Sequence, residues 1–191
     1  GVQTIYLGAP WILGYADNAL HTATPYYANQ PGYTSLPYAG PSANEMDSAF
    51  YNRYHQVWKL DTAMINYHIT HWNDAGYQMP YAIATWPGNG NTANGEPAVL
   101  APFADLNHNG YYEPAQGDYP LIRGDQAIWS IQHTCQDADS LHPALPMDLH
   151  MMLYEYGNVN DSDMWNTVFA NIEVINRSNE TYTGVRFGMF M

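Results

Sequence analysis

The sequence has few basic residues and a single cysteine. Five lysines and arginines stand against 18 aspartates and glutamates, which gives a formal net charge of -13. Such a chain repels phosphate backbones and anionic lipid, so nucleic acid and membrane insertion are not expected. The lone Cys135 excludes an internal disulfide framework. Stability must therefore come from core packing, with bound ions as the other available source.

Long apolar runs are also missing. The sequence contains no run of about 18 apolar residues and no basic segment followed by an apolar one, so neither a membrane span nor a signal peptide is predicted. Because the chain begins at Gly1, we expect a removed targeting peptide or a piece of a larger protein. The 191 residues suffice for one main folding unit. With 15% aromatic but only 12% charged residues, the composition is common among extracellular and carbohydrate-facing proteins.

The first part of the chain predicts a hairpin and one helix. Two apolar, aromatic stretches, "QTIYLGAPWILGYA" and "ALHTATPYY", predict strands, and Asp17 and Asn18 between them predict the turn. Further along, Asp61 is the expected N-cap of a short helix. Apolar side chains follow it at helical spacing, at Ile65, Ile69 and Trp72. The segment from about residue 73 to 120 is dense in Gly, Pro, Asn and Asp, which predicts a long irregular stretch of the functional or ion-stabilised kind.

The second part predicts consecutive strands. Four runs are rich in β-branched and aromatic residues, "QAIWSIQHTC", "MDLHMMLYEYG", "WNTVFANIEVINRS" and "YTGVRFGMFM". We therefore expect an all-β fold, an antiparallel β-sandwich with one short helix. Residues 1–191 would form a single β-rich module, with an irregular, ion-stabilised wrap over 1–123 and antiparallel strands over 124–191. Because the last run is still apolar at Met191, we expect the polypeptide to continue, or another protein chain to pair with this strand edge.

The stretch "DLNHNGYYEPAQGDYP", which begins at Asp105, is similar to a calcium loop until its last position. An EF-hand loop takes oxygen ligands at positions 1, 3, 5, 7, 9 and 12, with glycine at position 6. Gln116 stands at position 12 and has no carboxylate, so a later acid must replace it. The predicted ligands of a structural calcium ion are Asp105, Asn107, Asn109, the backbone carbonyl of Tyr111, Glu113 and Asp118. The alternative is that the Asn and Asp side chains form only Asx-turns.

Several blocks of sequence resemble a known family. The blocks are "TIYLGAPWILGY", "LHTA", "YNRYHQVWKL", "APFADLNHNGYYEPAQGDYPLIRGDQAIWSI" and "FANIEVINRSNETYTGVRFGMFM". In this order they resemble the N-terminal region of large secreted Bacteroidota proteins that carry a C-terminal sorting domain for type IX secretion. The resemblance implies an extracellular or cell-surface β-rich module with a calcium loop and no established catalysis. Asn109 departs from the pattern, because the family often has aspartate there.

Other chemistry is weighed against structural roles. His68 and His71 lie three residues apart, whereas helical zinc ligands usually lie four apart, so hydrogen-bonded histidines are expected instead. The sequence has no GxSxG nucleophile elbow and no phosphate-binding loop. Among enzymes a glycoside hydrolase is the least unlikely, although the strand residues Asp148, Glu155 and Glu173 are expected to be structural.

Two functions from different classes follow. The first is a non-catalytic structural or adhesive module of a secreted or cell-surface bacterial protein. The alternative is a carbohydrate-binding module of a secreted polysaccharide-degrading system, which would present exposed Tyr and Trp side chains to glycans.

Overall fold

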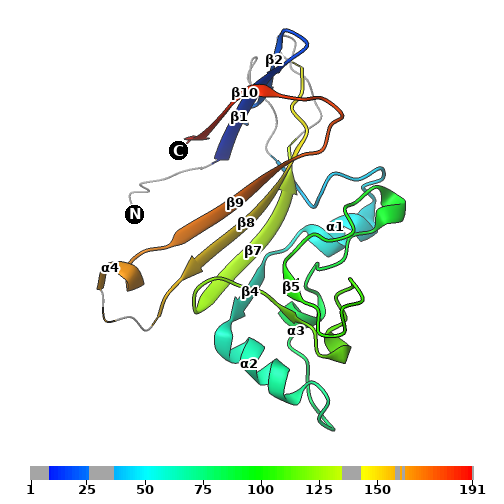
Figure 1. The fold of residues 1–191 in the computed structure, drawn as a ribbon, viewed down its shortest axis with the longest axis vertical. Helices are drawn as coiled ribbons and strands as arrows, with labels where there is room; N and C mark the ends of the chain where they lie inside the picture. Colours follow the sequence, from blue (N-terminus) through cyan, green and yellow to red (C-terminus); the bar gives the residue numbers. More distant parts are fainter. Residues whose placement is uncertain (1–8, 26–36, 135–142, 158–159, 161, 191) are drawn as a thin grey trace. The chain divides into compact units, whose positions relative to one another are not determined.

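The structure is a computed structural model that describes residues 9–25, 37–134, 143–157, 160 and 162–190 (Figure 1). Its strands are β1 (Ala9–Ala16), β2 (Ala19–Ala23), β3 (Tyr38–Ala39), β4 (Trp58–Asp61), β5 (Phe103–Ala104), β6 (Tyr119–Pro120), β7 (Gln126–His133), β8 (Met147–Glu155), β9 (Phe169–Asn176) and β10 (Thr183–Phe190). Its helices are α1 (Ser48–Tyr54), α2 (Thr62–His71), α3 (Tyr81–Ala84) and α4 (Ser162–Trp165), with 3-10 turns η1 (Thr92–Asn94) and η2 (Pro114–Gln116). Antiparallel sheets dominate over a few helices, which confirms the expected all-β class.

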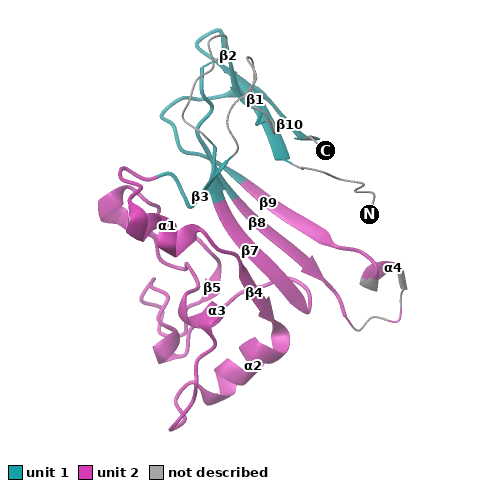
Figure 2. Ribbon diagram, turned by 180° about the vertical axis from the view of Figure 1, so that it is seen from behind, with its two compact units in different colours: residues 1–42, 132–149, 174–191 teal, residues 43–131, 150–173 magenta. Residues whose placement is uncertain are grey.

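The chain divides into two compact units (Figure 2). Unit 1 comprises Gly1–Ser42, Gln132–Leu149 and Val174–Met191, and unit 2 comprises Ala43–Ile131 and His150–Glu173. The irregular wrap was expected over residues 1–123 and the antiparallel strands over 124–191. Both units contain residues from each of these two ranges. Strands β7, β8 and β9 each contribute residues to both units.

Unit 1 contains a three-stranded sheet in the order β10-β1-β2. The β1–β2 hairpin turns at Asp17 and Asn18, which have φ values of 48° and 61°. A two-residue turn with positive φ at both positions matches the right-handed twist of the strands it joins. The predicted hairpin and its turn are therefore confirmed.

The core of unit 1 lies between this hairpin and the start of β8. Ile12 and Ala23 from the hairpin pack with three residues from the 145–149 segment, Leu145, Met147 and Leu149. Phe187 of β10 pairs directly with Ile12, so both side chains lie on the same face of the sheet. That face remains half exposed on β10, where Val185, Phe187 and Met189 are 45%, 49% and 53% exposed.

A five-stranded sheet has the order β3-β7-β8-β9, and β4 also pairs with β7. The four strands expected after Gly124 are β7, β8, β9 and β10, so these predictions are confirmed. The first of these runs, "QAIWSIQHTC", ends at Cys135, which lies outside the described residues.

The core of unit 2 is aromatic. Trp58 of β4 and Trp86 both pack against Trp129 of β7, with ring centroids 5.6 and 5.4 Å away. The indole N–H of Trp58 donates to the Thr85 carbonyl at 2.9 Å, which ties the irregular segment after α2 to the sheet. The indole N–H of Trp86 donates to the Pro102 carbonyl at 3.0 Å, which joins two parts of that segment.

The predicted helix is α2, and its N-cap is confirmed. The Asp61 carboxylate accepts a hydrogen bond from the backbone N–H of Met64 at 2.7 Å. The expectation of one helix is incomplete, because the structure also contains α1, α3 and α4. Helix α1 has an N-cap of its own, in which the Asp47 carboxylate accepts from the N–H of Phe50 at 2.9 Å. Both α3 and α4 have four residues, too few to show a helical period.

Candidate cation-binding loop

The loop that follows β5 is closed at its base by a short ladder. Strands β5 and β6 pair antiparallel, with Phe103 opposite Pro120 and Ala104 opposite Tyr119. The intervening residues, 105–118, hold all the side chains predicted to bind calcium. The segment from about residue 73 to 120 is largely irregular, as expected, although it includes α3 and the turns η1 and η2.

The first three predicted side-chain ligands fold inward onto the backbone of the loop. The Asp105 carboxylate accepts from the N–H groups of Asn109 at 3.3 Å and Gly110 at 2.7 Å. The side-chain oxygen of Asn107 accepts from the N–H of Asn109 at 3.1 Å, and that of Asn109 accepts from Tyr111 at 2.8 Å. The oxygens at loop positions 1, 3 and 5 thus lie on one concave run of backbone. Gly110 at position 6 has φ 82°, the left-handed conformation that glycine adopts readily.

Glu113 joins the same group of side chains. Its Oε2 accepts from the Asn107 amide at 3.4 Å and from the Asn109 amide at 2.5 Å. Gln116 also reaches this group, donating to Glu113 Oε1 at 2.7 Å and accepting from the Asn107 amide at 3.1 Å. Four of the predicted ligands therefore converge: Asp105, Asn107, Asn109 and Glu113.

Asp118 is buried and holds the two ends of the loop together. One of its carboxylate oxygens accepts from the N–H of Leu106 at 2.9 Å, and the other accepts from the N–H of Glu113 at 2.8 Å. Its full burial places it beneath the loop rather than among the exposed polar side chains. Gln116 stands at the position where an EF-hand has its last carboxylate. Its side chain hydrogen-bonds the side chains of Asn107 and Glu113, whereas the Asp118 carboxylate bonds backbone N–H groups.

The side chain of Tyr111 points to solvent and is exposed. The predicted role of its backbone carbonyl as a calcium ligand stays a prediction. His108 has φ 59°, so the backbone turns through the left-handed region both before and at Gly110.

Two side chains, the buried His68 and the half-buried Asn89, fasten the loop to the rest of unit 2. His68 of α2 lies between the Tyr77 hydroxyl at 2.9 Å and the Asp118 carbonyl at 3.0 Å. Because the carbonyl can only accept, His68 Nε2 carries the proton and Nδ1 accepts from Tyr77. Burial lowers the pKa of His68, which favours this neutral ring. The expectation of a hydrogen-bonded histidine at this position is confirmed.

Asn89 makes the second attachment. Its amide accepts from the N–H of Tyr112 at 2.8 Å and donates to the carbonyl of the same residue at 3.0 Å, as a neighbouring strand would. The Tyr112 hydroxyl donates to the Ile83 carbonyl at 2.7 Å, and burial raises the pKa of this phenol, so it stays protonated. The loop is thus held on a fixed support at Tyr112 and Asp118.

The loop contains side-chain oxygens of the kind that bind hard cations. Carboxylate and amide oxygens are the ligands that Ca²⁺ prefers, and affinity rises with the number of charged ligands. Two carboxylates, those of Asp105 and Glu113, lie in the converging set. The Asn107 and Asn109 amides donate to Glu113, and their oxygens accept backbone N–H groups two residues ahead, as in the Asx-turns of the alternative interpretation. In the part of the chain that the structure describes, no group of three or more His, Cys, Asp or Glu side chains is arranged to hold a metal ion. Of the four side chains that converge in this loop, two are carboxylates and two are amides.

Other residues considered in the sequence have structural contacts. Asp148 is buried in unit 1, where one carboxylate oxygen accepts from the N–H and hydroxyl of Ser42 at 2.8 and 2.6 Å and the other lies 3.2 Å from Arg177 Nε. His71 is half-buried on α2, with its Nδ1 2.9 Å from the Tyr67 carbonyl oxygen. Trp58, Trp86 and Trp129 are buried, so these rings belong to the core and not to a sugar-binding face.

Comparison with protein-family models, with curated proteins and with solved structures finds no match. Within the described residues, no helix has the length and apolar character needed to cross a membrane. The function is therefore inferred from the geometry of the chain itself.

Proposed function

We propose that the chain is a non-catalytic structural or adhesive module of a secreted or cell-surface bacterial protein, ordered by one calcium ion in the 105–118 loop. The observation that carries the proposal is the convergence of Asp105, Asn107, Asn109 and Glu113 on a single concave turn. The resemblance to secreted Bacteroidota proteins supports the extracellular location.

Calcium would act by neutralising the loop. Without a cation, the Asp105 and Glu113 carboxylates repel each other in a chain that already carries a formal charge of -13. Asp118 joins Leu106 to Glu113 through its two carboxylate oxygens, so an ion that orders the loop would also stabilise the base of the loop. With two carboxylates among the converging ligands, the expected dissociation constant is roughly 10⁻⁴ to 10⁻³ M, the range of extracellular calcium modules.

The fold suits a structural role. We propose a sandwich arrangement within unit 1, in which the β1–β2 hairpin covers the part of β8 that belongs to this unit, residues 147–149. Within unit 1, Ile12 and Ala23 of the hairpin pack with Met147 and Leu149 of β8, which supports this layering. Sandwich modules of this kind present loops at their ends and sheet edges along their sides.

The exposed face of β10 supports an interaction with another chain. Val185, Phe187 and Met189 continue the face that holds Ile12, yet about half of each side chain is exposed. Among the described strands β10 is also the edge of its sheet, so its outer row of backbone groups can pair with a further strand. We propose that a strand from another protein chain pairs here and covers the three apolar side chains.

Amide hydrogen exchange tests the calcium part of the proposal directly. In the presence of 5 mM Ca²⁺, against EDTA, we expect slower exchange over 105–118, with smaller changes over β7 and β8. The same concentration of Mg²⁺ should protect less, because Mg²⁺ demands near-ideal octahedral geometry and keeps several waters. Equal exchange with and without Ca²⁺ would refute the proposal.

A further inference from the structure

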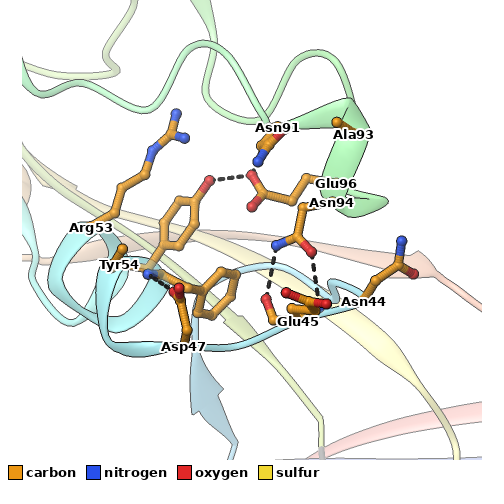
Figure 3. A pocket seen from close by; sticks show the side chains of 11 residues that line it. Asn44, Glu45, Asp47, Arg53, Tyr54, Asn91, Ala93, Asn94 and Glu96 are labelled. Atoms are coloured by element: carbon orange, nitrogen blue, oxygen red, sulfur yellow. Dashed lines mark hydrogen bonds between the residues drawn. The ribbon is translucent and has the colours of Figure 1, made fainter.

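A polar pocket in unit 2 shares no lining residue with the calcium loop. Helix α1 and the residues before it form one wall, and η1 with its flanking residues forms the other (Figure 3). The pocket has a volume of about 540 Å³. That volume lies within the range of roughly 300–1,000 Å³ that is typical of small-molecule sites.

The two walls are held together by one asparagine. The Asn94 side chain donates to the Glu45 carbonyl at 2.8 Å and accepts from the Glu45 N–H at 2.9 Å (Figure 3). The Asn94 carbonyl also accepts from the N–H of Asn44 at 2.8 Å. Because these bonds fix the backbone on both sides, the pocket is formed before any ligand binds.

Glu96 is the buried charged group of the pocket, and it is only 5% exposed. Its Oε2 accepts from the Tyr54 hydroxyl at 2.6 Å and from the N–H of Asn91 at 2.7 Å. Its Oε1 accepts no hydrogen bond from any residue in the described part of the chain, and it is not sealed from solvent. The carboxylate is therefore held in place through one oxygen and presents the other to the pocket.

The hydroxyl of Tyr54 keeps its role as a donor. Burial raises the pKa of this phenol, and the hydrogen bond to Glu96 raises it further. The phenol therefore stays protonated at neutral pH and continues to orient the carboxylate.

The charge of the lining is negative. Glu45, Asp47 and Glu96 carry three formal negative charges against one positive charge on Arg53, a net of -2. Arg53 donates to the Asn89 carbonyl at 2.5 Å and lies over the Tyr54 ring, 5.1 Å from its centroid, rather than pairing with Glu96. A cation in the pocket would thus meet an uncompensated carboxylate.

The same features disfavour other ligand classes. An anion would face the net negative lining. A hard metal ion needs several convergent oxygen ligands, whereas Glu96 offers one oxygen that is not already held by Tyr54 and Asn91. A sugar ring stacks on an aromatic face, but Phe50 and Tyr54 are 5% and 1% exposed and present no free face.

We propose that this pocket binds an organic cation, an ammonium or guanidinium group whose N–H donates to Glu96 Oε1. A charge-assisted hydrogen bond of this kind is roughly twice as strong as a neutral one. The cation belongs either to a free small molecule or to a lysine or arginine side chain of a partner protein.

The test is an NMR titration of the whole chain at low salt. The probes are n-butylammonium and N-methylguanidinium, with n-butanol and N-methylurea as their neutral counterparts and glucose as a sugar. We expect at least one cation to bind saturably, with a dissociation constant on the order of 1 mM, and to shift signals of Tyr54, Asn91 and Glu96. The neutral probes should not saturate. Blocked lysine and arginine then distinguish the sources, since tighter binding than the small probes identifies a protein side chain and equal binding identifies a free cation.

Three single substitutions distinguish an effect of charge on cation binding from a loss of folding. Glu96→Gln should weaken cation binding about tenfold or more, while Glu180→Gln, which changes an exposed carboxylate in unit 1, should leave it unchanged. Arg53→Gln keeps Glu96 intact and should strengthen binding about two- to fivefold, because it removes the one positive charge of the lining. This second variant decides the question if Glu96→Gln does not fold. Equal binding of neutral probes, saturable binding of glucose alone, or no saturation by either cation at 50 mM would overturn the proposal.

Discussion

The Nε2–H of His68 donates to the backbone carbonyl of Asp118 at 3.0 Å, and this bond joins helix α2 to the base of the candidate calcium loop. Asp118 in turn holds Leu106 and Glu113 with its carboxylate. Protonation of His68 adds a proton at Nδ1, which accepts from the Tyr77 hydroxyl, and it places a charge on a buried ring beside the base of the loop.

The first prediction concerns pH. Burial lowers the pKa of His68 below its ordinary value, whereas the unfolded chain titrates at about 6.5. Between these two pKa values the unfolded state binds more protons, so stability falls as the pH falls below about 6.5. Urea denaturation from pH 8 to 5 should show a steeper loss for the natural chain than for His68→Gln, which keeps an N–H donor but does not titrate. Parallel curves for the two proteins would contradict this role.

The second prediction concerns Asn89. Asn89→Ala removes both partners of the Tyr112 backbone, and leaving a buried donor or acceptor unpaired costs about 1–3 kcal/mol each. We expect a lower free energy of unfolding and faster hydrogen exchange over the loop. Asn52→Ala, at an exposed position of α1, is the control and should stay within about 0.5 kcal/mol of the natural chain. Equal effects of the two substitutions would argue against the attachment.

The third prediction compares two glycines of the loop region. Gly110 and Gly117 have φ values of 82° and 102°, so alanine is strained at both, at a cost of about 1–2 kcal/mol. At Gly110 a Cβ would meet no atom within 4 Å, whereas at Gly117 it would lie 3.0 Å from the Trp72 indole. Thermal unfolding should therefore show a larger loss for Gly117→Ala than for Gly110→Ala. The reverse order would mean that the Trp72 contact does not constrain the loop.

The fourth prediction concerns the exposed face of β10. Phe187→Lys places a charge on the half-exposed apolar side and should prevent pairing with a partner strand while costing little stability. Sedimentation velocity should show association of the natural chain that rises with concentration if the partner is a second copy. Lys59→Ala, at an exposed position of β4, should leave this association unchanged. A monomer at all concentrations would exclude a second copy as the partner.

The elements that the sequence predicts well are those whose signal is local. Asp17 and Asn18 accept positive φ values and so define the hairpin turn, and Asp61 caps α2 with its own side chain. The strands β7 to β10 have β-branched and aromatic runs separated by turn residues. These features need no knowledge of distant contacts.

The missed features depend on weaker or distant signals. Helix α1 had a local signal, because Asp47 stands at its N-cap and the aromatic Phe50 and Tyr54 are spaced four residues apart. The pocket beside it could not be predicted, since Asn94 contacts Glu45 across 49 positions of sequence.

The ligand set of the loop shows the same limit. Positions 105–113 follow the spacing of a calcium loop, and the side chains of Asp105, Asn107, Asn109 and Glu113 lie together in the structure. After Pro114 the chain forms a 3-10 turn, which brings Gln116 to Glu113 and takes Asp118 into the core. The number of residues alone does not determine which of the two lies beside the converging side chains.

The measurement that tests the central claim most directly is a terbium titration followed by calcium competition. Tyr111 and Tyr112 lie within the loop and can sensitise the emission of a bound Tb³⁺ ion. We expect saturable emission that Ca²⁺ displaces with a dissociation constant of roughly 10⁻⁴ to 10⁻³ M. Asp105→Asn should weaken it about tenfold or more, and Asp74→Asn, outside the loop, should not. Emission that is absent, or that is the same for Asp105→Asn and the natural chain, would contradict the calcium site.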